Sequence, residues 1–230
     1  MSVSIGGCAI PFHVAVDGPS GTGRRALASG LAAELGLAHI NMGPFYTSVA
    51  RAVIARRADP ADAASCIAIA EALPASAAWR TDCRCRLVAE MAAKVSAIPG
   101  VRAAHLDLQR RLAAGHPGAP NGAVMDGRDI GTVVLPGADL KFYLTATIAA
   151  RTQRLHDRDP FGISLRQLRK SLLGQDALEE GHGPEAVRPA RNAVIINTTG
   201  LPDAAVLQRA LCEFYALFPV FMAPAAAVAV

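Results

Sequence analysis

A glycine-rich loop near the N-terminus is the segment with the clearest chemical potential. It reads Gly-Pro-Ser-Gly-Thr-Gly-Arg-Arg-Ala over residues 18–26 and follows a short apolar run. Gly18 and Gly23 occupy the two fixed glycines of the spacing G-x-x-x-x-G-K-[ST]. In that motif, backbone N–H groups and the N-terminus of the following helix enclose a phosphate group. The loop therefore predicts a phosphate-binding site at the start of a helix.

Two positions of this loop depart from the motif. Arg24 stands where lysine normally reaches the phosphates, and Arg25-Ala26 stands where a residue with a hydroxyl would contact magnesium. Arginine keeps the positive charge, but its planar fork differs in shape from a compact ammonium. Ala26 offers no oxygen to a metal ion, so no metal ligand is predicted in the loop. The alternative interpretation is a tight strand-to-helix turn that binds no nucleotide.

The apolar pattern around the loop predicts alternating strands and helices. Short apolar runs indicate buried strands, and they lie at Phe12–Val16, Ala38–Asn41, Ala123–Met125, Leu140–Leu144 and Val194–Ile196. Helical spacing covers Arg24–Leu35, Thr147–Asp157, a short stretch near Leu165–Leu173, and Pro202–Leu217. Residues 45 to about 115 are helical in pattern, with breaks at Asp59-Pro60 and at Pro99.

This order of elements predicts an α/β protein with a central parallel sheet and functional loops at the carboxyl ends of the strands. The 230 residues are expected to form a single domain over 1–230, with a core of 12–43 and 122–217. Two insertions are expected on that core. One is helical and covers about 44–121, and the other is largely polar and covers about 158–188.

Composition excludes several other classes of protein. Hydrophobic residues make up 52% of the chain and charged residues 18%, which argues against long disorder. The net charge is +4, and no dense Lys/Arg run with interleaved aromatic residues indicates nucleic-acid binding. No stretch approaches the ~20 apolar residues of a membrane span, and the N-terminus lacks the pattern of a secretory signal. We therefore expect a cytoplasmic protein with neither nucleic acid nor membrane as partner.

The cysteines fit a reducing compartment. There are five of them, scattered along the chain, at Cys8, Cys66, Cys83, Cys85 and Cys212. An odd number without a secretory signal predicts free thiols. Cys83 and Cys85 form a C-x-C pair without a second pair or a nearby histidine, so two reduced thiols are favoured over a zinc site.

Several strings together resemble the bacterial cytidylate kinases, a family of P-loop nucleoside-monophosphate kinases. Residues 17–21 resemble the family's DGPSG opening, and residues 126–136, Asp-Gly-Arg-Asp-Ile-Gly-Thr-Val-Val-Leu-Pro, resemble its DGRDMGTVVFP signature. Residues 95–102 with Gln109-Arg110 are similar to its VAxxPxVR…QR helix pair, and residues 197–199 to its D-[ST]-T. The likeness runs from about residue 12 to residue 217.

The resemblance implies a P-loop three-layer fold with a central parallel sheet, a monophosphate-binding insertion and a lid. It implies transfer of the γ-phosphoryl group of ATP to CMP or dCMP with Mg²⁺, by a monomer. The implied catalytic residues are Arg24, Arg128 and Asp129. The implied ATP-binding residues are Gly18, Pro19, Ser20, Gly21, Thr22, Gly23, Arg24, Arg25 and Ala26. The implied substrate-binding residues are Gly43, Tyr46, Arg102, Arg128 and Asp129.

The implied roles of three substrate-binding residues agree with their chemistry. Arg102, Arg128 and Asp129 match family positions expected to hold the phosphate and the cytosine of CMP, and arginine binds a phosphate through two parallel charged hydrogen bonds. A carboxylate accepts a hydrogen bond from the amino group of cytosine, as implied for Asp129. Two alternatives involve no substrate: Arg128 and Asp129 could pair with each other, and Arg102 could be a solvated residue of a helix.

Several family positions are changed. The family's D-S-G-x-x-Y-R appears as residues 41–47, where Met42 replaces a hydroxyl and Thr47 replaces an arginine. A further family serine falls at Ala93. The lid of the family carries a run R-D-x-R-D-R-x-R, whereas residues 175–182 read Gln-Asp-Ala-Leu-Glu-Glu-Gly-His. Arginines nearby that could replace the missing lid arginines are Arg151, Arg154, Arg188 and Arg191.

Two hypotheses therefore stand. The first is an active ATP-dependent kinase of CMP or dCMP. The second is a catalytically degenerate homologue that binds a nucleotide or a protein partner, because the changes cluster where phosphate groups would be held. Removing one arginine that contacts a transferring phosphoryl group typically costs about 10³- to 10⁵-fold in rate.

Overall fold

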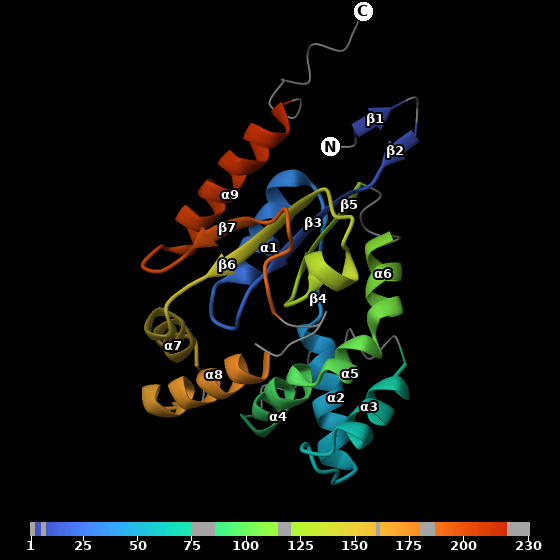
Figure 1. Cartoon of the computed structure of the whole chain (residues 1–230), viewed down its shortest axis with the longest axis vertical. Coiled ribbons are helices and arrows are strands. Elements are labelled where there is room, and N and C mark those ends of the chain that lie inside the picture. Colours follow the sequence, from blue (N-terminus) through green and yellow to red (C-terminus); the bar gives the residue numbers. More distant parts are fainter. Residues whose placement is uncertain are drawn as a thin grey trace, which may run out of the picture.

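The computed structural model of the chain describes residues 3–5, 8–74, 86–114, 121–159, 162–179 and 187–219. A five-stranded parallel sheet forms its centre, in the order β4-β5-β3-β6-β7 (Figure 1). The strands are β3 (Phe12–Asp17), β4 (Ala38–Asn41), β5 (Gly122–Asp126), β6 (Leu140–Thr145) and β7 (Val194–Asn197). Each of the five expected strands is confirmed, within one residue at either end.

Two helices cover one face of the sheet. They are α1 (Arg24–Leu35) and α9 (Asp203–Leu217). Leu27, Leu31 and Leu35 recur every fourth residue of α1, so they share one face and pack on the sheet. This helix ends at Gly36, whose φ of 64° is the left-handed conformation that closes many helices. Phe214 of α9 is buried in the same cluster.

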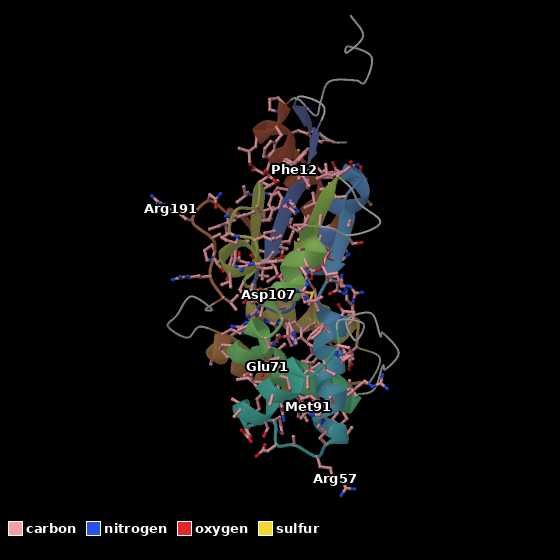
Figure 2. All side chains as sticks on the ribbon, turned by 90° about the vertical axis from the view of Figure 1, so that its right-hand side faces the viewer. Phe12, Arg57, Glu71, Met91, Asp107 and Arg191 are labelled. Carbon is pink, nitrogen blue, oxygen red and sulfur yellow. The ribbon has the colours of Figure 1, made fainter. Side chains whose placement is uncertain are left out.

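The other face of the sheet shares its core with a helical insertion between β4 and β5. The insertion contains α2 (Gly43–Ala55), α3 (Ala63–Glu71), α4 (Arg86–Ala97), α5 (Pro99–Ala103) and α6 (Leu106–Ala114). Ala15 and Met125 of the sheet belong to one buried cluster with Phe45 and Val49 of α2. Helices α2–α5 lie beyond the carboxyl ends of the strands. In Figure 2, Met91 and Arg57 mark this end of the molecule, and Phe12 lies near the other.

Two further helices follow β6. Helix α7 (Ile148–Asp157) begins at Thr147, whose hydroxyl caps it, and α8 (Leu165–Glu179) packs against both α7 and α4. We predicted only a short helix near Leu165–Leu173, and that prediction was wrong about its length. The additional turns carry Asp176 and Glu179, which form ion pairs with arginines of other segments.

Three elements were not predicted. Strands β1 (Val3–Ile5) and β2 (Cys8–Ile10) form a separate antiparallel hairpin, and η2 (Ile130–Val134) is a short π-helix after β5. Of the cysteines with described side chains, Cys66 is a buried free thiol and Cys212 an exposed one. Cys83 and Cys85 lie outside the described residues. Within the described part of the chain, no helix has the length and apolar character needed to cross a membrane.

Candidate functional site

The glycine loop curls between β3 and α1. Gly18, Gly21 and Gly23 have φ angles of 142°, 82° and 94°, which only glycine adopts readily. A side chain at Gly18 would also collide with the carbonyl oxygen of Leu144. No side chain of the described residues caps the N-terminus of α1. The first N–H groups of that helix are therefore available to an anion.

Side chains of α7 and of the residue after β7 donate hydrogen bonds to the carbonyl oxygens of the loop. Arg151 donates to the carbonyl of Ser20 at 3.2 Å, and Arg154 to that of Gly21 at 3.4 Å. The hydroxyl of Thr198, which is fully buried, donates to the carbonyl of Thr22 at 3.0 Å. Three consecutive carbonyl groups are thus fixed by α7 and by the residue after β7, which stabilises the curl of the loop.

Arg24 links this loop to the segment that follows β5. Its guanidinium donates to the carbonyl oxygen of Gly127. Burial, followed by the charge of Arg128, lowers the pKa of Arg24. A pocket of ≈ 150 Å³ lies beside it, lined by Gly21, Gly23, Arg24, Arg25, Ala26, Asp126, Arg154, Leu155 and Arg158. Arg25 is exposed, and it lies at this pocket rather than inside the core.

Asp17 anchors the start of the π-helix to the base of the loop. Its two carboxylate oxygens accept hydrogen bonds from the backbone N–H groups of Ile130 at 2.8 Å and Gly131 at 2.7 Å. The side chain is buried, and burial raises the pKa of Asp17 to about 6, against the lowering effect of those two hydrogen bonds. Asp17 thereby fixes the segment that carries Arg128 and Asp129.

The titration of Asp17 gives a testable pH dependence. The folded pKa of about 6 lies above the ordinary 3.8, so the folded state binds the proton more tightly than the unfolded state. The contribution of this carboxyl to stability is therefore present at low pH and is lost as the pH rises through about 6. In an NMR titration, the amide resonances of Ile130 and Gly131 should shift with a midpoint near pH 6. A midpoint near 4 would contradict this assignment.

Arg128 faces the glycine loop and is paired with α8. It donates to the hydroxyl of Ser20 at 3.1 Å and forms an ion pair with Glu179. Glu179 is only 4% exposed, so this pair is largely removed from solvent. The alternative in which Arg128 and Asp129 pair with each other is wrong, because each has a different partner.

The partner of Asp129 is Arg102. The two side chains are joined at 3.1 Å and both are buried, so the alternative of a solvated Arg102 is also wrong. Arg102 also donates to the carbonyl oxygens of Ser96 and Ala97. Tyr46 lies close to this pair. Burial, followed by the negative charge of Asp129, raises the pKa of Tyr46 to about 12.

The remaining predicted positions lie around this centre. Gly43 begins α2, where its N–H donates to the side chain of Asn41. Met42 is buried in the core of the insertion, and the hydroxyl of Thr47 bonds back to the carbonyl of Gly43. The structure therefore brings together Tyr46, Arg102, Arg128 and Asp129, with the glycine loop facing Arg128. The hydrogen bonds of Gly43 are with Asn41 and Thr47.

The four arginines considered as replacements for lid arginines occupy two places. Arg151 and Arg154 contact the glycine loop, but Arg151 is neutralised by a bidentate pair with Asp176 of α8. Arg188 and Arg191 line a different pocket. Sequence reasoning missed Asp126, Asp176 and Glu179. Asp126 could have been found, because it ends a strand adjacent to the one that precedes the loop.

Comparisons with known proteins point to one family. A family model described as "Cytidylate kinase" matches residues 14–215. The chain is 37% identical over 205 residues to the cytidylate kinase of Methylocella silvestris, covering 86% of this chain and 91% of that protein. It is 38% identical over 195 residues to the cytidylate kinase of Paramagnetospirillum magneticum, covering 82% and 90% of the two chains.

A solved structure shares the fold at low sequence identity. The crystal structure of an uncharacterized protein from Eubacterium ventriosum aligns with a TM-score of 0.53 and 12% identity, covering 90% of this chain and 99% of that one. That likeness concerns the fold alone. The family model and the curated relatives span most of the chain, and they show that this chain belongs to the cytidylate kinase family.

Proposed function

We propose that this chain is a nucleoside-monophosphate kinase that transfers the γ-phosphoryl group of ATP to CMP or dCMP. One observation carries the proposal: the glycine loop and the Arg128 segment face each other and are joined by direct contacts. Arg128 reaches Ser20 of the loop, and Arg24 of the loop reaches Gly127. A donor phosphate on the loop would therefore lie beside the cation proposed to hold the acceptor.

The proposed mechanism relies on positioning and charge. The N–H groups of residues 18–23 and the guanidinium of Arg24 hold the donor phosphates. Arg128, Arg102 and Asp129 hold the acceptor, and Asp129 accepts a hydrogen bond from the cytosine amino group. An oxygen of the acceptor phosphate forms the new bond to the γ-phosphorus, and the bond to the departing ADP oxygen breaks. The arginines offset the charge that develops during this transfer.

Among the described residues around the glycine loop, one carboxylate is suited to hold magnesium. Ala26 carries no oxygen, and the hydroxyl of Thr22 donates to the carbonyl of Pro19. Asp126 lines the pocket beside the loop, and its Oδ1 lies 2.7 Å from Nε2 of His39. Mg²⁺ is often bound by one or two carboxylates together with substrate phosphates, so Asp126 fits this role. Asp126 would hold the ion, which would supply positive charge against the phosphates.

An assay of ADP release tests the proposal. With ATP, Mg²⁺ and each of CMP, dCMP and UMP as acceptors, we expect turnover with the two cytidine nucleotides above the ATP-only background. Arg24→Lys should retain or raise this turnover, because lysine supplies the compact charge usual at this position. Absence of turnover with every monophosphate would remove the proposed activity.

A second candidate function is favoured by the ion pairs of α8. Glu179 neutralises Arg128, and Asp176 neutralises Arg151, so two arginines near the loop are already paired with carboxylates. A homologue with such a lid would bind nucleotides without efficient transfer. Thermal stabilisation by CMP without ADP release in the same preparation would favour this function over the first.

A further inference from the structure

A second pocket lies on the sheet, apart from the glycine loop. Its volume is ≈ 420 Å³, and it is lined by Gly131, Thr132, Lys141, Arg188, Pro189, Ala190, Arg191 and Asn192. Leu140 and Phe142 pack on the α1 and α9 side, so Lys141 between them points to the opposite face. The hydroxyl of Tyr143 holds the segment after residue 186 on that face, by donating to the carbonyl of Val187. None of these lining residues lines the pocket beside the glycine loop.

Lys141 places a positive charge in the wall of this pocket. Its side chain is only 6% exposed, and its ammonium donates to the carbonyl of Pro136 and to the side-chain oxygen of Asn192. Both acceptors are neutral, and in the described part of the chain no carboxylate pairs with this ammonium. A buried charge normally has an opposite charge as partner. This ammonium therefore provides an attractive contact for an anion.

Two arginines extend the positive charge to the mouth of the pocket. Arg188 and Arg191 are exposed, and no ion pair joins either of them to another described residue. Figure 2 shows Arg191 at the margin of the molecule, with its side chain extended toward solvent. No lining residue is acidic. Guanidinium groups bind phosphate oxygens through paired, charged hydrogen bonds.

We propose that this pocket binds a phosphate-bearing small molecule of nucleotide size, at a site separate from the proposed phosphoryl-transfer site. Its volume lies in the range of about 300–1,000 Å³ typical of small-molecule pockets, and an isolated phosphate would fill only part of it. Lys141 holds the phosphate at the wall, Arg188 and Arg191 hold it at the mouth, and Thr132 and Asn192 contact the remainder. Gly131 connects the pocket to Asp17, at the base of the glycine loop.

An NMR titration of the ¹⁵N-labelled full chain with sodium pyrophosphate tests this site. We expect saturable shifts at the amides of Gly131, Thr132 and Asn192, with a midpoint different from that at Gly21 and Gly23. The variant R188Q/R191Q should weaken binding at the first set by about tenfold or more, from the loss of two charged contacts. Binding at the glycine loop should remain unchanged.

A matched control separates a specific site from general charge attraction. The variant R111Q/R209Q removes the same charge from two exposed arginines elsewhere, on α6 and α9. It should leave both midpoints unchanged. The proposal is overturned if the shifts at Gly131, Thr132 and Asn192 do not saturate, if they follow the midpoint of Gly21, or if both double variants weaken them equally. Each result can be read whether or not the chain phosphorylates CMP.

Discussion

Replacing Arg128 with methionine is expected to lower kcat/KM for CMP by about 10³-fold or more, the usual loss for one cation at a transferring phosphoryl group. Methionine preserves most of the bulk and removes the charge. The residue lies between Ser20 of the glycine loop and Glu179 of α8, so no other described cation occupies the same position. The measurement is the rate of ADP release at several CMP concentrations.

Stability must be measured beside activity in this variant. Without Arg128, the buried carboxylate of Glu179 loses its cation, and breaking such a pair costs about 3–5 kcal/mol of unfolding free energy. The double variant R128M/E179L should unfold in urea close to the wild-type midpoint and still fail to turn over. Arg169→Met, at an exposed position of α8, serves as the control with activity near wild type. Activity within a few-fold of wild type in the double variant would contradict the role of Arg128.

Asp129→Ala is expected to lower the free energy of unfolding by about 3–5 kcal/mol, because it breaks the buried ion pair of Asp129 with Arg102. The two side chains are 6% and 8% exposed, so water cannot readily replace the lost partner. The carbonyl oxygens of Ser96 and Ala97 remain as acceptors and lessen the cost. Urea unfolding measures the effect.

The same position should also control binding of the acceptor. R102M/D129L replaces the buried pair with apolar side chains and should recover much of the stability, while KM for CMP rises steeply. Asp107→Ala removes an exposed carboxylate from the first turn of α6, so it should cost no more than about 1 kcal/mol of stability and leave KM unchanged. An Asp129→Ala variant as stable as wild type would show that the pair is not an important contact of the fold.

The parts of this fold that local sequence determines were predicted correctly. The central strands β3, β5 and β6 are almost wholly buried and the edge strands β4 and β7 only partly, but the apolar run in each can be recognised without knowledge of distant residues. The glycines of the loop were predicted for the same reason, because their positive φ angles are a local requirement. The break at Asp59-Pro60 fell between α2 and α3, and Pro99 is the first residue of α5.

The parts that depend on distant partners could not be predicted. The last turns of α8 are polar, and their ion pairs with Arg128 and Arg151 join segments far apart in the chain. The π-helix begins where Asp17 of β3 accepts hydrogen bonds from the backbone N–H groups of Ile130 and Gly131. The resemblance to a family named Arg102, Arg128 and Asp129, but it did not indicate which of them would pair.

The bonds around Thr198 determine how the glycine loop can open. The N–H of Thr198 donates to Thr145 at the end of β6, its hydroxyl reaches Thr22, and Arg154 spans Gly21 and Leu201. The loop is therefore bonded to the edge of the sheet and to the start of α9. Release of these loop carbonyl groups should require separation of β7 from β6, rather than fraying of the loop alone. The conformation of the phosphate-binding loop thus depends on the edge strand β7. A change that weakens the pairing of β7 with β6 would also make the loop more mobile.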